Sequence, residues 1–160
     1  MFFRHLLLQI KNNKVWFLLA GIIFVLDRVT KYLTLKFLYA KGSVSLLPFF
    51  SLTYVENSGS AFGLFQNANL FLLILSLFVL LLMFIWRKDI FVLGNWAKCG
   101  YYLIFAGALG NIYDRIFLGY VVDFLDFHFW PVFNIADSSI SIGAVLIAIS
   151  ILMEGKRRNK

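Results

Sequence analysis

The stretch ANLFLLILSLFVLLLMFIW, from Ala68 to Trp86, decides the fold because it contains no charged residue. A helix that crosses a bilayer needs roughly 20 apolar residues, with about 17 as the lower limit. This run is long enough, and nothing in it requires water. It therefore predicts a membrane-spanning helix.

Three further apolar runs lie around it. The first, VWFLLAGIIFVL, begins at Val15 and stops at Asp27. Counted along the chain, the first of the four runs and the third, within residues 97–115, reach spanning length only if the charged residues at their ends lie at or inside the membrane interface. We predict one transmembrane domain over residues 1–160, an all-α membrane protein of four transmembrane helices, with spans at approximately 14–34, 68–86, 97–115 and 135–153.

The composition supports a membrane location. The chain is 61% hydrophobic and 14% charged, with a mean hydropathy of +0.84. A water-soluble domain is about 45–50% apolar and about a quarter charged. The net charge of +7 comes from basic residues at the ends of the apolar runs, so no nucleic-acid partner is expected. The single cysteine, Cys99, excludes an internal disulfide, and no metal site is expected.

Arg4, Lys11 and Lys14 precede the first apolar run, as basic residues do in a signal peptide. No small-x-small cleavage site follows that run. We therefore expect an uncleaved first span.

The basic residues predict the orientation, because Lys and Arg are more frequent on the cytoplasmic side. Both termini are expected in the cytoplasm, since ten basic residues lie on their side and five on the other. The ten are Arg4, Lys11, Lys14, Arg87, Lys88, Lys98, Lys156, Arg157, Arg158 and Lys160; the five are Arg28, Lys31, Lys36, Lys41 and Arg115. Most acidic residues lie on the outer side, namely Asp27, Glu56, Asp114, Asp123, Asp126 and Asp137.

Two outer loops, 39–67 and 116–134, are expected to carry the polar chemistry. In the first, polar and apolar residues roughly alternate from Phe50 to Val55, and Asn57-Ser58-Gly59 reads as a turn. This pattern predicts a small sheet on the membrane surface. The second loop is short and aromatic.

Charged residues at membrane depth are costly and usually mark function. Arg28 and Lys36 are long enough to snorkel to water, whereas Asp27 is too short. Asp27 and Lys31 are four residues apart on one helix face and are expected to pair. Arg115 either pairs with a carboxylate or snorkels.

Two aspartates are the best candidates for catalysis. Asp123 lies in the apolar stretch VVDF, and Asp137 lies at the start of the fourth span. Asn134 and Asp137 have the spacing of a helix N-cap and N3 position, so a capping role for Asp137 is the alternative. Two close carboxylates share a proton, which allows one to act as base and the other as acid. Apolar neighbours should keep Asp123 protonated, and the helix N-terminus should keep Asp137 ionised.

The chain resembles the lipoprotein signal peptidases, the type II signal peptidases of bacteria. The matching stretches occur in the family's order and spacing. They are DRVTK (27–31), NSGSAFGLF (57–65), GALGNIYDR (107–115), VVDF (121–124) and FNIADSSI (133–140).

The resemblance implies an aspartic endopeptidase of the bacterial cytoplasmic membrane that cleaves prolipoproteins before a diacylglyceryl-modified cysteine. It implies an extracytoplasmic β-cradle, an active site on that side, no cofactor, and a monomer in contact with membrane lipid. Asp123 and Asp137 would be the catalytic pair. The positions implied for site architecture or substrate contact are Asp27, Lys31, Asn57, Gly59, Gly107, Asn111, Arg115, Asn134 and Ala136.

Three other function classes compete with this interpretation. A serine hydrolase would use Ser138 or Ser139 with His128, but no G-x-S-x-G elbow occurs. A metalloprotease would use Asp123, Asp126, His128 and Asp137, but no H-E-x-x-H occurs. A proton-coupled carrier or a membrane assembly subunit would need polar steps across the whole membrane, and the acidic residues gather on one side.

Overall fold

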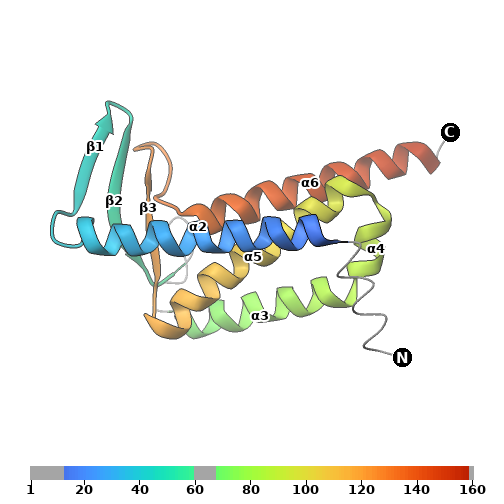
Figure 1. Cartoon of the computed structure of the whole chain (residues 1–160), viewed down its shortest axis with the longest axis horizontal. Helices are drawn as coiled ribbons and strands as arrows, with labels where there is room; N and C mark the ends of the chain where they lie inside the picture. The colour runs from blue at the N-terminus through green and yellow to red at the C-terminus, as the bar shows by residue number, and fades with distance from the viewer. Residues whose placement is uncertain (1–12, 60–67, 159–160) are drawn as a thin grey trace.

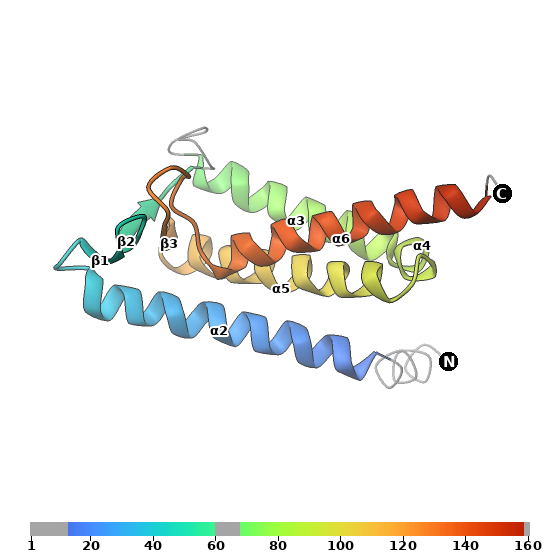
Figure 2. The ribbon, with the colours of Figure 1, turned by 90° about the horizontal axis from the view of Figure 1, so that it is seen from above.

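The computed structural model describes residues 13–59 and 68–158. Four long helices lie side by side, and a small sheet crosses one end of them (Figure 1). The long helices are α2 (Lys14–Leu38), α3 (Asn69–Ile85), α5 (Asn95–Phe117) and α6 (Ile135–Arg158). The short helix α4 (Arg87–Val92) joins α3 to α5 at the end opposite the sheet (Figure 2). A helix therefore lies at each predicted span, although α3 is one residue shorter than its span at each end, and α4 was not predicted.

Among the helices of residues 13–59 and 68–158, only α6 is both long and apolar enough to be recognised as a membrane span from length and composition, over Ile135–Lys156. Helix α3 is also apolar but is shorter. The long helix α2 carries Asp27, Arg28 and Lys31 in its second half. Large apolar side chains nevertheless face outward on these helices, including Val15, Leu70 and Leu152, each about two-thirds exposed. Such outward apolar faces suit a lipid environment.

The sheet is antiparallel, with strands in the order β1-β2-β3. Strand β1 (Ser43–Leu47) pairs with β2 (Phe50–Asn57), and β2 pairs with β3 (Val121–Asp126). The predicted alternating segment is therefore a strand, and it continues for two residues beyond Val55. The predicted first outer loop includes residues 60–67, which lie outside the described residues.

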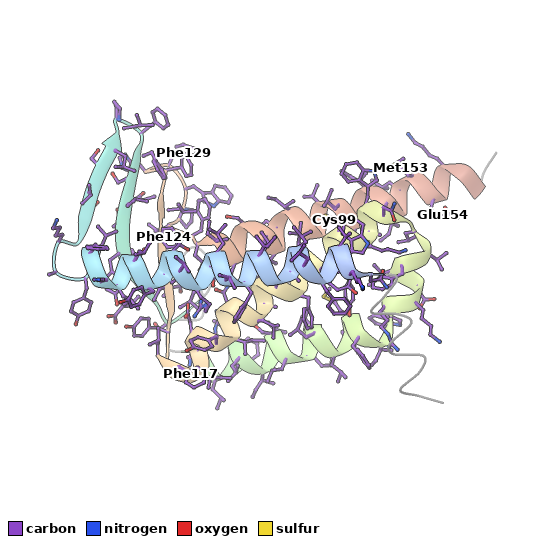
Figure 3. All side chains as sticks on the ribbon, in the orientation of Figure 1. Cys99, Phe117, Phe124, Phe129, Met153 and Glu154 are labelled. Atoms are coloured by element: carbon purple, nitrogen blue, oxygen red, sulfur yellow. The ribbon has the colours of Figure 1, made fainter. Side chains whose placement is uncertain are left out.

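Two strands were not predicted, for different physical reasons. The first four residues of β3 are all buried, so the strand has no alternation between apolar and polar positions. All five residues of β1 are exposed, so its sequence carries no buried face. Figure 3 shows Phe124 of β3 where the sheet meets the helices and Glu154 towards the far end of α6.

Close packing between α5 and α6 depends on glycine. A Cβ at Gly107 would lie 2.4 Å from the Ala136 backbone oxygen and 2.4 Å from Ser139 Oγ. A Cβ at Gly110 would lie 2.6 Å from Asp27 Oδ2. The small residues of α5 therefore let α6 and the Asp27 carboxylate lie directly against that helix.

Candidate active site

A cavity of about 610 Å³ opens where the sheet meets α5 and α6. Asp123 and Asp137 both line it, so the structure brings together the two aspartates singled out in the sequence. Its wall also contains apolar side chains, chiefly from the segment that leads into α6. The other lining residues are Asn57, Gly59, Asn111, Arg115, Val121, Trp130, Pro131, Val132, Phe133, Ser138, Ile140, Ser141 and Ile142.

The Asp123 carboxylate is buried and held by two amide side chains. Asn134 Nδ2 donates to Asp123 Oδ1 at 2.6 Å, and Asn57 Nδ2 donates to Asp123 Oδ2 at 2.8 Å. The Asn57 side chain is itself fixed, because the Gly59 backbone N–H donates to its Oδ1 at 3.0 Å. The predicted turn after β2 therefore orients one of the two donors to Asp123.

The N-terminus of α6 is closed by a reciprocal cap. The Asp137 backbone N–H donates to Asn134 Oδ1 at 2.8 Å, and the Asn134 backbone N–H donates to Asp137 Oδ2 at 3.3 Å. This is the capping arrangement that the spacing of the two residues predicted. Asn134 contacts both aspartates, so it links the two carboxylates, and the cap does not remove Asp137 from the cavity.

Asn111 of α5 holds the other oxygen of Asp137. Its Nδ2 donates to Asp137 Oδ1 at 2.7 Å, while its Oδ1 accepts a hydrogen bond from Lys31 Nζ at 2.9 Å. An ammonium group can only donate, so Lys31 fixes which end of the Asn111 amide faces the aspartate. Each carboxylate oxygen of the pair therefore accepts a hydrogen bond from an N–H group.

The surroundings of Asp123 favour its protonated form. Burial raises the pKa of the Asp123 carboxyl to about 7, and repulsion from Asp137 acts in the same direction. The hydrogen bonds from Asn57 and Asn134 and the charge on Lys31 oppose that rise in pKa. Burial and the second carboxylate together outweigh these opposing contacts.

Comparison with known proteins shows the family to which the chain belongs. The family model described as signal peptidase (SPase) II matches residues 19–153. The chain belongs to the signal peptidase II family. It is therefore a membrane peptidase, and the stretches quoted above lie within the matched region.

Individual relatives agree with the family model. A lipoprotein signal peptidase of Thermodesulfovibrio yellowstonii is 49% identical over 131 residues, which cover 78% of this chain and 86% of the relative. One from Nostoc sp. is 43% identical over 146 residues, covering 89% and 92%.

Two solved structures described as bacterial membrane enzymes share the fold. One is 32% identical with a TM-score of 0.81 and covers 90% of this chain and 91% of its own. The other is 33% identical with a TM-score of 0.76 and covers 87% and 93%. The helical bundle with its small sheet is thus the architecture of known membrane enzymes.

The other residues that the sequence analysis assigned to the site lie in two places. Gly59 and Arg115 line the cavity, whereas Gly107 and Ala136 lie at the contact between α5 and α6. Arg115 is half-buried and, among the described residues, has no carboxylate within ion-pair distance. Its charge still acts on Asp137 and Asp123. Arg115 therefore neither pairs directly nor extends fully into solvent.

The residues needed by the competing hydrolases are not assembled. Ser138 and Ser139 donate their hydroxyls to backbone oxygens of Asn134 and Ala136. His128 Nε2 lies 2.9 Å from the hydroxyl of Ser51, on the sheet. Within residues 13–59 and 68–158, no three His, Cys, Asp or Glu side chains gather in a way that holds a metal ion.

Two charged residues, the partly buried Arg28 and the buried Asp114, were not predicted as part of the site. Arg28 was expected to snorkel, but its guanidinium donates to Asp27 and to Asp114, each at 2.6 Å. Asp114 is 1% exposed and accepts a hydrogen bond from the Val122 backbone N–H at 3.2 Å. The snorkelling prediction is wrong for Arg28 because two buried carboxylates bind it. The sequence did contain a signal for these contacts, because an Asp-Arg dipeptide occurs at 27–28 and again at 114–115.

Proposed function

We propose that this peptidase removes the signal peptide from bacterial prolipoproteins, cleaving just before a diacylglyceryl-modified cysteine. Lipoprotein signal peptidase is the name that its curated relatives carry. The observation that carries the mechanism is that Asp123 and Asp137 line one cavity. Aspartates in this arrangement hydrolyse an amide without a metal, an organic cofactor or a covalent intermediate.

In the proposed reaction, water lies between the two carboxyl groups and the scissile carbonyl. Asp137 removes a proton from the water as the water oxygen bonds to the carbonyl carbon. Asp123 gives its proton to the amide nitrogen as the C–N bond breaks. The amide donors Asn57, Asn111 and Asn134 hold both carboxyl groups in place during this exchange.

Asp123 is the proposed acid and Asp137 the proposed base. Asp137 lies in the first turn of α6, where the helix dipole favours a negative charge by about 0.3–1 kcal/mol, or up to about 2 when partly buried. Burial and repulsion from Asp137 raise the pKa of Asp123 to about 7. A coupled pair titrates jointly, so the two pKa values belong to the pair as a whole.

The apolar wall of the cavity supports a lipid-modified substrate. Val132, Phe133, Ile140 and Ile142 line it beside the aspartates. Ile142 belongs to α6, which is long and apolar enough to cross a membrane. A substrate whose acyl chains remain in the bilayer can then present its peptide to the carboxyl groups from the side.

Cleavage by the purified protein in detergent tests this function. A peptide that carries a diacylglyceryl cysteine should be cut before that cysteine, and the same peptide with an unmodified cysteine should be cut far more slowly. No cleavage of the lipidated peptide, or equal cleavage of both peptides, would contradict the proposed substrate class.

The pH dependence follows from the raised pKa of Asp123. The proposed acid is protonated below about pH 7 and loses its proton above that value. Turnover should therefore fall by about tenfold for each pH unit above this transition. Initial rates between pH 5 and 10 measure it. Asp126→Asn should leave the transition unchanged, because a backbone hydrogen bond from His128 lowers the pKa of Asp126 and its side chain faces Thr53. A rate that rises through pH 7 to 9 would contradict the need for a protonated carboxyl group in the reaction.

We also propose four membrane crossings, with both termini in the cytoplasm and the site on the extracytoplasmic side. The ten-to-five distribution of Lys and Arg supports this topology. A reporter fused after Lys160 should be active only in the cytoplasm, and one inserted near Lys41 only outside. An external reporter signal from the C-terminus would contradict both the topology and the location of the site.

A further inference from the structure

Three buried charged side chains and one partly buried one gather close to the two aspartates. Arg28 lies 2.6 Å from both Asp27 and Asp114, and Lys31 lies 3.1 Å from Asp27 and 2.8 Å from Asp114. Each cation therefore bridges both carboxylates, and the two positive and two negative charges balance. Breaking up a buried cluster of this kind costs several kcal/mol, so its geometry is strongly held. We call these four residues the charge cluster.

The two carboxylates of the charge cluster also bind the backbone beside the catalytic residues. Asp27 Oδ1 accepts the backbone N–H of Ala136 at 3.0 Å, and Asp114 Oδ2 accepts that of Val122 at 3.2 Å. Ala136 directly precedes Asp137, and Val122 directly precedes Asp123. The same pattern thus occurs twice, once for each aspartate.

A third connection runs through an amide. Lys31 Nζ donates to Asn111 Oδ1, and Asn111 Nδ2 donates to Asp137 Oδ1. The charge cluster therefore reaches the start of α6 through Ala136 and through Asn111. It reaches β3 through Val122. No member of the charge cluster lines the cavity.

We propose that the charge cluster sets the separation of the two catalytic aspartates, and that Arg28 and Asp114 act through it as positioning residues. This rests on the proposed function, because it takes Asp123 and Asp137 as the catalytic pair. Two carboxyl groups share a proton only while they stay close together. Arg28 joins the carboxylate that holds Ala136 to the one that holds Val122, so it links the two halves of the pair.

The alternative is that the charge cluster only packs α2 against α5. The two possibilities predict different kinetics. A packing role alone would lower stability and leave the turnover of folded enzyme unchanged. A positioning role lowers kcat and spares KM, since the charge cluster does not contact the cavity.

Arg28→Met and Arg28→Lys test the proposal in the full-length protein. In Arg28→Met, Lys31 still pairs with both carboxylates, so the bundle should fold while the link between them weakens. A displacement of about 1 Å costs on the order of 100-fold, so kcat should fall by about that factor while KM stays within about twofold. Arg28→Lys should lie between this variant and wild type, because an ammonium group lacks the two-pronged geometry of guanidinium. Lys36→Met is the matched control on the exposed face of α2 and should match wild type.

A second measurement needs no substrate. Infrared titration of the protonated carboxyl band reports the higher of the two pKa values of the aspartate pair. The charges of Arg115 on α5 and Lys31 on α2 also act on these aspartates. Aspartates that move apart repel each other less, so the upper transition should shift to lower pH in Arg28→Lys, which keeps the positive charge. Loss of charge alone would shift it to higher pH in Arg28→Met.

Two results overturn the proposal. One is that Arg28→Met and Arg28→Lys both fold and both keep the wild-type kcat. The other is an unchanged carboxyl transition in Arg28→Lys. If wild type itself fails to cut the lipidated peptide, the proposed function is wrong, and the infrared titration still decides whether the charge cluster sets the separation of the aspartates.

Discussion

Asp123→Asn and Asp137→Asn should each reduce cleavage of the lipidated peptide by roughly 10⁴-fold, at the upper end of what a general acid or base contributes. Asparagine keeps the size of the side chain but neither accepts the proton from water nor donates one to the leaving nitrogen. Both oxygens of Asp123 accept hydrogen bonds from side-chain amides. An asparagine at position 123 would therefore place its own N–H group against one of these N–H donors. Single-turnover rates in detergent, with thermal unfolding of each variant, separate lost chemistry from lost fold.

Comparison variants make the result specific. His128→Ala should be mild, because His128 contacts Ser51 on the sheet and does not reach the pair. Ser139→Ala should also be mild, because its hydroxyl donates to a backbone oxygen within α6. Near-normal turnover of either aspartate variant would exclude the two-aspartate mechanism, and a large loss in Ser139→Ala would revive the serine alternative.

The sequence predicted the helices well because their signal is local. An apolar run of sufficient length is visible without any knowledge of its neighbours, and Asn69–Ile85 falls inside the predicted span. Helix α2 continues to Leu38, four residues beyond its predicted end. Asp27 and Lys31 lie within this helix and are paired inside the bundle. Strand β3 was missed because it is buried on both sides and lacks a period of two.

In the site, too, contacts between residues close in sequence were predictable and long-range contacts were not. The spacing of Asn134 and Asp137 is local, so the helix cap was predictable. The pairing of Asp27 with Lys31 is local as well, and the structure confirms it. The bond between Arg28 and Asp114 joins residues 86 positions apart, so no pattern along the chain indicates it. Such long-range contacts decide which buried charges support the aspartates.

Gly107→Ala should be the most damaging change outside the charged residues. The added methyl group would lie 2.4 Å from the Ala136 backbone oxygen, closer than real Cβ contacts. The carbonyl of Ala136 belongs to the peptide bond that leads into Asp137, so it yields only if the start of α6 moves away from α5. That movement stretches the bond from Asn111 to Asp137, which is now 2.7 Å. We expect about 1–3 kcal/mol of destabilisation from overpacking and a loss of turnover on the order of 100-fold.

Gly21→Ala is the matched control, because it lies in helix α2 with nothing within 4 Å of the added methyl group. Alanine is favoured over glycine within a helix by about 0.5–1 kcal/mol, so this variant should be as stable as wild type or more so and fully active. Adding Ser139→Ala to Gly107→Ala removes one of the three contacts closer than 3.0 Å and leaves those with the Ala136 backbone oxygen and with Ile140 Cγ1. The double variant should therefore remain impaired. Full recovery of turnover would show that the Ser139 hydroxyl, and not the Ala136 backbone, requires glycine at position 107.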